Sequence, residues 1–124
     1  MDLQNLEGCG QYLGKYQLNG RWKLVAMDNE TLNHNKQTLL ISTEEARISG
    51  HAGCNQFFGS IREIGENSIS FDRIGSTKMA CPDLQMENKY LGLLGEASLE
   101  WTIEKDGKLI LTGQSGQLAL ERLD

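Results

Sequence analysis

Long apolar runs are missing from this sequence, and so is a recognisable export signal. A membrane-spanning helix needs about 20 mostly apolar residues, and no stretch of the chain approaches that length. The apolar core of a signal peptide is not visible either. Two readings fit this absence: the protein is cytoplasmic, or Met1 stands after a signal that has been removed.

Clusters of basic residues are also missing. The chain has 12 lysine and arginine residues against 17 aspartate and glutamate residues, which gives a formal net charge of −5. Nucleic-acid binding needs a basic surface that displaces counterions from phosphates, and an anionic membrane surface repels an acidic domain. We therefore expect no nucleic-acid partner, and membrane association only through a lipid attached near the N-terminus.

Catalytic signatures are absent too. His34 and His51 are the two histidines that could act as bases near neutral pH, and His34 lies in a polar turn. The chain has no G-x-S-x-G elbow and no glycine-rich phosphate loop, and its carboxylates are scattered. A Cys54–His51 pair is conceivable, but a disulfide at Cys54 would forbid it. We expect no catalytic residues and no bound cofactor.

What remains is the pattern of one small domain. A chain of 124 residues is long enough to build a single domain around its own core. Residues 1–17 are weakly patterned, so we predict a flexible leader there and a folded domain over 18–124. Within the leader we allow one short edge strand near 12–18, with Asn19-Gly20 as a hairpin turn.

Apolar residues that alternate between turn signals predict about seven or eight short strands. Trp22, Leu24 and Ala26 share one face of the first main strand, and Asp106-Gly107 is a strong hairpin signal near the end of the chain. The predicted strands cover 21–26, 38–43, 46–49, 54–61, 68–71, 99–104, 108–112 and 117–123. Short connections require antiparallel pairing. We therefore predict a mainly β fold, an antiparallel barrel or sandwich.

One segment has helical rather than strand spacing. Leucines recur on one stripe of residues 83–96, together with Glu87. Pro82 suits the first helical position, Asp83 favours the helix dipole, and Gly95 is suited to ending a helix. We predict one α-helix around residues 83–96.

The three cysteines pose two separate questions. A disulfide between Cys54 and Cys81 would stabilise the fold by about 3–4 kcal/mol, whereas two small buried thiols are the other reading. The compartment decides between these readings, so both stay open at this point. Cys9 is left over, and we expect a free thiol because no lipoprotein signal precedes it.

Two further groups of residues are candidates for binding. His51 and Cys54 form an H-x-x-C pair, but an offset of three in a regular strand puts them on opposite faces, so we expect no metal site. Four aromatic side chains could line a ligand cavity, although such residues more often fill the core of a small barrel. They are Trp22, Phe57, Phe71 and Trp101.

Two short motifs carry a family resemblance. One is the G-C-N-x-F-x-G run at 53–59, and the other is the T-x-M-A-C run at 77–81. Together with the L-N-G-R-W-K-L stretch at 18–24, Glu87 and the hairpin that contains Trp101, they make residues 18–123 resemble the META domain family, including its HslJ-like heat-shock members. The motif residues are Gly53, Asn55, Phe57, Gly59, Thr77 and Met79.

The resemblance implies a small antiparallel β-barrel or half-barrel with one helix, in agreement with the pattern above. It also implies an envelope, periplasmic or secreted protein, often a lipoprotein, and such a compartment favours the Cys54–Cys81 disulfide. No catalytic residue set comes with it. We expect a monomeric, non-enzymatic domain with a stress-related or interaction role, whose partner is another protein or a small apolar ligand. The alternatives are a barrel that binds an apolar ligand or lipid, and a cysteine-based redox protein.

Overall fold

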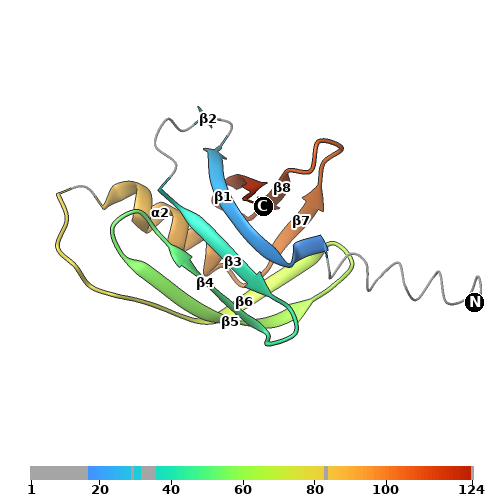
Figure 1. Ribbon diagram of the computed structural model, residues 1–124, viewed down its shortest axis with the longest axis horizontal. Coiled ribbons are helices and arrows are strands. Elements are labelled where there is room, and N and C mark those ends of the chain that lie inside the picture. Colours follow the sequence, from blue (N-terminus) through green and yellow to red (C-terminus); the bar gives the residue numbers. More distant parts are fainter. Residues whose placement is uncertain (1–16, 29, 32–35, 83, 124) are drawn as a thin grey trace, which may run out of the picture.

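Nine strands and one helix make up the part of the chain that the computed structural model describes, residues 17–28, 30–31, 36–82 and 84–123 (Figure 1). The elements are β1 (Gly20–Met27), β2 (Glu30–Thr31), β3 (Thr38–Ser42), β4 (Arg47–His51), β5 (Gln56–Ile64), β6 (Ser68–Ser76), α2 (Gln85–Leu94), β7 (Leu99–Ile103), β8 (Leu109–Thr112) and β9 (Gln117–Arg122). Cys9, His34, Asp83 and most of the predicted leader lie outside the described residues. Within the described residues, the helical segments are too short to span a bilayer.

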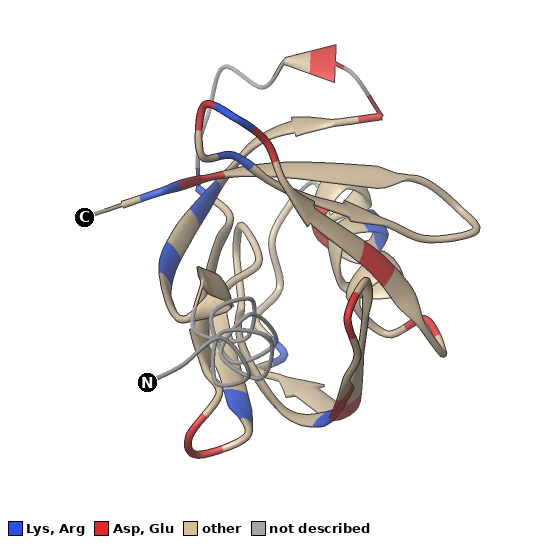
Figure 2. Cartoon of the chain, turned by 90° about the vertical axis from the view of Figure 1, so that its right-hand side faces the viewer, with Lys and Arg blue, Asp and Glu red and all other residues tan. Residues whose placement is uncertain are grey.

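Hydrogen bonding between the first and last long strands closes the sheet. The strand order is β2-β1-β3-β4-β5-β6-β7-β8-β9, and β1 also pairs with β9. Every pairing is antiparallel, so β1 and β3–β9 form a closed barrel and β2 is an extra strand on β1. Figure 2 shows these strands curling around a common interior. The predicted mainly β, antiparallel fold with one helix is confirmed.

Apolar side chains of the strands and the helix pack into one interior cluster. Trp22 and Leu24 of β1 are fully buried, as their alternation predicted. A register shift between Leu24 and Ala26 then moves the inward position by one residue, so Met27 is buried instead of Ala26. The prediction for Ala26 is wrong because a β-bulge adds a residue that alternation cannot anticipate.

The β5–β6 hairpin is longer than its pattern predicted. β6 continues beyond the predicted 68–71 to Ser76, and β5 continues to Ile64. Two register shifts interrupt their pairing, and one of them lies at Arg73. Apolar alternation stops at Asp72 and Arg73, which are exposed, although the strand goes on. A bulged strand therefore looks shorter in the sequence than it is.

The two described residues before Asn19 are helical, so the chain does not enter β1 through a hairpin. Residues 17–18 are helical and Gly20 already belongs to β1, so the predicted strand is wrong at its described end and so is the predicted two-residue turn. Leu18 is fully buried, and its carbonyl accepts a hydrogen bond from Trp22 Nε1 at 3.0 Å. Packing of Leu18 against the barrel replaces the local turn that the Asn-Gly pair suggested.

Helix α2 is shorter than predicted. It begins at Gln85, so the first-position role expected for Pro82 is wrong. The preceding segment is tied to the barrel through Cys81, and it takes a non-helical path up to the start of the helix. Gly95 follows the last helical residue, as predicted, and its backbone N–H bonds back to the last turn.

Contacts from α2 show that it lies across one end of the barrel. The Tyr90 hydroxyl donates to the carbonyl of Thr38 at the start of β3, with a distance of 2.9 Å. The Tyr90 ring packs edge-on against Phe57, with ring centroids 5.8 Å apart. Lys89 forms an ion pair with Asp28, directly after β1. The end of β1 and the start of β3 belong to the same end of the barrel, and α2 covers it.

Candidate functional site

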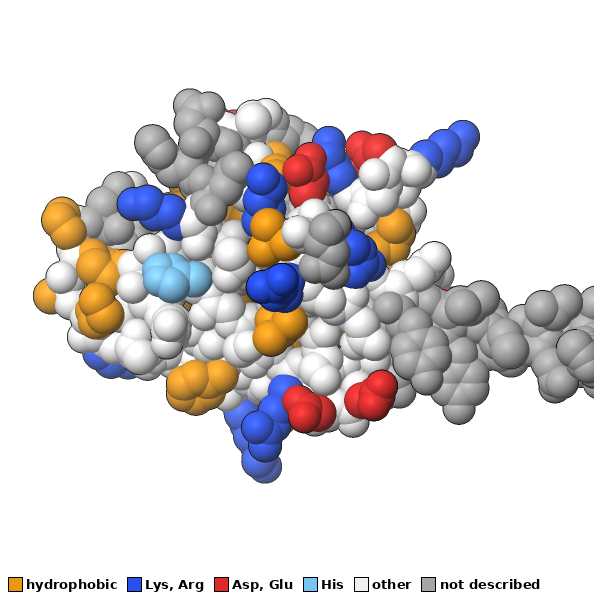
Figure 3. Space-filling view, in the orientation of Figure 1, with side chains coloured by type: hydrophobic (Ala, Val, Ile, Leu, Met, Phe, Trp, Pro, Cys, Tyr) orange, Lys and Arg blue, Asp and Glu red, His pale blue; other side chains and the backbone are white. Residues whose placement is uncertain are grey.

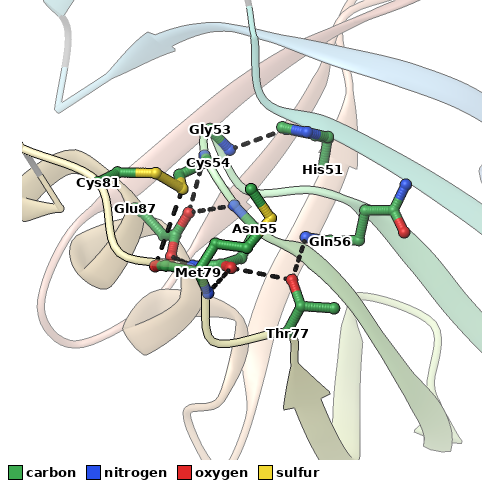
Figure 4. The surroundings of a disulfide bond; sticks show 9 residues. All are labelled: His51, Gly53, Cys54, Asn55, Gln56, Thr77, Met79, Cys81 and Glu87. Atoms are coloured by element: carbon green, nitrogen blue, oxygen red, sulfur yellow. Dashed lines mark hydrogen bonds between the residues drawn. A yellow bond between two sulfur atoms is a disulfide. The ribbon is translucent and has the colours of Figure 1, made fainter.

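A disulfide joins the turn between β4 and β5 to the segment between β6 and α2. Cys54 in the turn is bonded to Cys81, with the Cα atoms 6.4 Å apart and a sequence separation of 27 residues (Figure 4). Both cysteines are half-buried. Of the two readings that the sequence left open, the bridged one is found. A bridged cysteine has no thiolate, so Cys54 is neither a nucleophile nor a metal ligand in this state.

Asn55, next to the disulfide, is buried and forms hydrogen bonds through both Oδ1 and Nδ2. Its Oδ1 accepts hydrogen bonds from Thr77 Oγ1 at 2.9 Å and from the Met79 backbone N–H at 2.6 Å. Its Nδ2 donates to Glu87 at 2.7 Å. The Thr77 hydroxyl in turn accepts from the backbone N–H of Gln56 at 3.1 Å. Figure 4 shows how Asn55 thereby connects the two sequence motifs to each other.

Glu87 reaches the same turn from the first turn of α2. Its side chain is only 5% exposed, and Oε1 accepts from the backbone N–H groups of Cys54 at 2.9 Å and Asn55 at 2.8 Å. Burial raises the pKa of Glu87, but hydrogen bonds from Asn55 and Cys54 and the nearby His51 lower it more, so the pKa lies below its ordinary value of 4.5. Glu87 is therefore an ionised acceptor at neutral pH.

The two motif glycines permit close packing. Gly53 has a φ of +127°, a conformation that favours glycine. A Cβ atom on Gly53 would also lie 3.1 Å from Gln37 Nε2. A Cβ atom on Gly59 would lie 3.0 Å from a side-chain carbon of Ile74 and 3.2 Å from the carbonyl oxygen of Asp72. At both positions a larger residue would therefore collide with neighbouring atoms.

His51 is the last residue of β4, directly before the turn that carries Cys54, and is half-buried. Its Nδ1 accepts a hydrogen bond from the backbone N–H of Gly53 at 3.2 Å, and its own backbone N–H donates to Thr38 Oγ1 at 3.0 Å. Because Cys54 is bridged, the conceivable His51–Cys54 pair is not available for catalysis. In the described residues, histidine, cysteine and carboxylate side chains do not gather in threes that could hold a metal ion.

The four candidate cavity aromatics are packed in the core. The exposed fractions are 0% for Trp22, 1% for Phe57, 6% for Phe71 and 9% for Trp101. The Trp101 indole N–H donates to the carbonyl of Gly65 at 3.3 Å, so both indoles bond to backbone. All four rings belong to the interior apolar cluster, so they are part of the core.

Glu87 is the residue whose role the sequence does not reveal. The predicted helix has it on an apolar stripe, and a carboxylate in that position is a usable signal because a buried charge needs partners. Its partner Asn55 is 32 residues away, which no local pattern predicts. Gln37 gives no signal at all. It is 6% exposed, and its Oε1 has no hydrogen-bond partner among the described residues.

Comparison with known proteins agrees with this architecture. The family model described as META domain matches residues 16–123. An NMR structure of a protein from Burkholderia xenovorans is similar, with 24% sequence identity, a TM-score of 0.67, and coverage of 89% of this chain and 86% of that one. A second NMR structure has 20% identity, a TM-score of 0.70, and coverage of 89% and 95%. At these identities the likeness concerns the fold alone. No curated protein matches the chain.

Proposed function

Because this chain belongs to the META domain family, we propose that it is a non-enzymatic envelope or secreted domain that acts by binding a partner, in a stress-related role. The way the motif side chains are used carries this proposal. Asn55, Thr77 and Glu87 bond to one another or to the backbone, which leaves no free acid, base or nucleophile among these three. Polar groups engaged in this way support a scaffold rather than a reaction centre.

The disulfide supports the proposed compartment. Disulfides persist in oxidising compartments and are rare in the cytosol. Thiol counting on denatured, non-reduced protein tests this part. The chain has three cysteines and two are in the bridge, so one free thiol is expected, that of Cys9. The protein would be expressed in its own host and purified after export. If it then still has three free thiols, the Cys54–Cys81 bridge does not form in that compartment and does not support an envelope location.

A turnover screen tests the non-enzymatic part. The purified protein would be assayed with ester, phosphate, glycoside, peptide and disulfide substrates, beside Cys54→Ser and His51→Ala variants. We expect no turnover that depends on either residue. Turnover that is lost in one of the two variants would overturn the proposal.

Two other functions would leave different traces. An apolar ligand inside the barrel should change both the tryptophan emission and the melting temperature, because Trp22 and Trp101 lie in the core. We expect lipids and hydrophobic dyes to change neither. A redox role would require a thiol of Cys54 or Cys81 with a pKa well below that of an ordinary cysteine. Alkylation rates of the reduced protein across pH would reveal one.

A further inference from the structure

A groove lies on the outer face of β3, β4 and β5. Its volume is about 440 Å³. Leu40, Ser49 and Phe58 line it and are direct neighbours across the three strands. The small serine therefore lies between two large apolar side chains, of which Leu40 is 41% exposed and Phe58 is 58% exposed. Large apolar side chains that flank a hollow and face solvent mark an interaction site.

Two arginines reach the same groove, Arg47 from the start of β4 and Arg73 from β6. In the part of the chain that the structure describes, neither guanidinium has an ion-pair partner. Figure 3 looks onto the face over β3–β5, where basic, acidic and apolar side chains are interspersed. The groove is lined by these two arginines and one glutamate, Glu45, which gives it a formal charge of +1 on a chain whose net charge is −5.

The backbone at Arg73 is in an unfavourable conformation. Its φ is +57°, in the left-handed region that favours glycine. It lies in the register shift between β5 and β6, and its N–H is held by Asp72 Oδ1 at 2.8 Å. Bulges re-aim side chains, and strained residues concentrate at functional sites. Asp28 and Ala46 also have positive φ values, but of these three residues only Arg73 lines the groove.

Backbone pairing excludes one mode of binding at this groove. β3, β4 and β5 each pair with a strand on both sides, so none of them offers a free edge to an added strand. A ligand must therefore be held by the side chains that line the groove. These offer two guanidinium groups, the Glu45 carboxylate and two apolar walls.

We propose that this groove binds a protein segment that carries a carboxylate next to a large apolar side chain. The inference rests on the proposed binding role and names the partner's chemistry. Arg47 and Arg73 hold the carboxylate by charge-assisted hydrogen bonds, and the apolar side chain occupies the space between Leu40 and Phe58. The net charge of −5 opposes binding to an anionic lipid surface, whereas a peptide can place its carboxylate beside the arginines and away from Glu45, which also lines the groove.

Selection from a display library of random dodecapeptides, with the oxidised full-length protein as bait, tests the proposal. Enriched peptides should carry a carboxylate close to an aromatic or long aliphatic residue. Their affinities would then be measured by fluorescence polarisation. We expect Arg73→Gly and Phe58→Ser each to weaken binding about tenfold, and added salt to weaken binding to the unmodified protein.

Arg73→Gly separates recognition from folding. Glycine accepts the positive φ, so the melting temperature should stay equal or rise while binding falls. Arg47→Ser, on a strand with an ordinary backbone, gives an independent second loss of charge. Lys105→Ser is the matched control because Lys105 is exposed and does not line the groove, and it should leave binding unchanged.

The failing outcomes are distinct. If the peptides bind the groove variants as tightly as the unmodified protein, this groove is not the binding site, but the proposal that the domain binds a partner still stands. No enrichment, or binding of phosphatidylglycerol vesicles that Arg47→Ser and Arg73→Gly abolish, would overturn the peptide as its ligand. Turnover in the substrate screen would instead overturn the proposed function, whatever the peptides show.

Discussion

Replacing Glu87 by glutamine tests the buried hydrogen-bond cluster most directly. The change removes the charge but keeps the size of the side chain. Glu87 Oε1 accepts two backbone N–H groups, and Oε2 accepts from Asn55 Nδ2. Glutamine has one carbonyl oxygen, so its NH₂ group would meet another donor. One hydrogen bond is lost and the remaining ones become bonds between neutral groups.

The magnitude follows from these three bonds. A hydrogen bond to a charged group contributes about 1.5–3 kcal/mol, and one between neutral groups about 1 kcal/mol. Losing one and weakening two should lower the free energy of unfolding by at least about 2.5 kcal/mol at pH 7. That is a large fraction of the 5–15 kcal/mol or so typical of a small domain. The Glu87→Gln variant should therefore fold but unfold at clearly lower urea concentration.

The assay is urea unfolding of the oxidised protein over a pH series, with Glu104→Gln as an exposed control. The pKa of Glu87 in the folded state lies below 4.5. A lowered carboxyl pKa gives stability that is fully present above the unfolded-state value and is lost as pH falls through the folded-state value. The difference between the two proteins should thus be constant near neutral pH and shrink below pH 4.5. Subtraction cancels the titration of all other groups.

Two results would refute this reasoning. A difference under about 0.5 kcal/mol at pH 7, the range of ordinary surface substitutions, would mean that the three hydrogen bonds contribute little. A difference that stays constant on acidification would mean that Glu87 is not the ionised acceptor.

Three further predictions concern stability. Replacing Cys81 by serine should lower the free energy of unfolding by about 3–4 kcal/mol, and reductant should destabilise the native protein but not this variant in urea unfolding. Tyr90→Phe loses the bond to the Thr38 carbonyl and should cost about 1 kcal/mol, whereas an unchanged urea midpoint would show that this bond is not formed. Arg73→Gly should be neutral or stabilising by up to about 1 kcal/mol, and a fall in melting temperature would mean that the Arg73 side chain supports the fold.

Regular elements were predictable where the local pattern is undisturbed. Alternation of Leu99, Trp101 and Ile103 predicted β7 at its observed position, and Gly95 correctly marked the end of α2. In a strand, alternate side chains face the core, so burial leaves its period in the sequence. The mainly β, antiparallel class follows from many such short segments joined by short turns.

Irregular positions were not predictable from the same pattern. Because of the bulge after Leu24, Met27 is buried instead of Ala26. The bulge at Arg73 interrupts the apolar alternation, so the second half of β6 was not predicted. A bulge shifts every following side chain by one position relative to the partner strand. Its place depends on how two strands fit together, which neither strand shows alone.

The sequence by itself therefore determined the fold class, the single helix, the family motifs, and two cysteines suited to a bridge. Tertiary structure alone decided that β1 pairs with β9, that Glu87 accepts a hydrogen bond from Asn55, and that Arg47 and Arg73 line one groove. The period of apolar residues shows which side of a strand or helix faces the core, because that side is set by the local geometry of the element. It does not record which distant residue lies opposite, since that depends on the packing of the whole barrel.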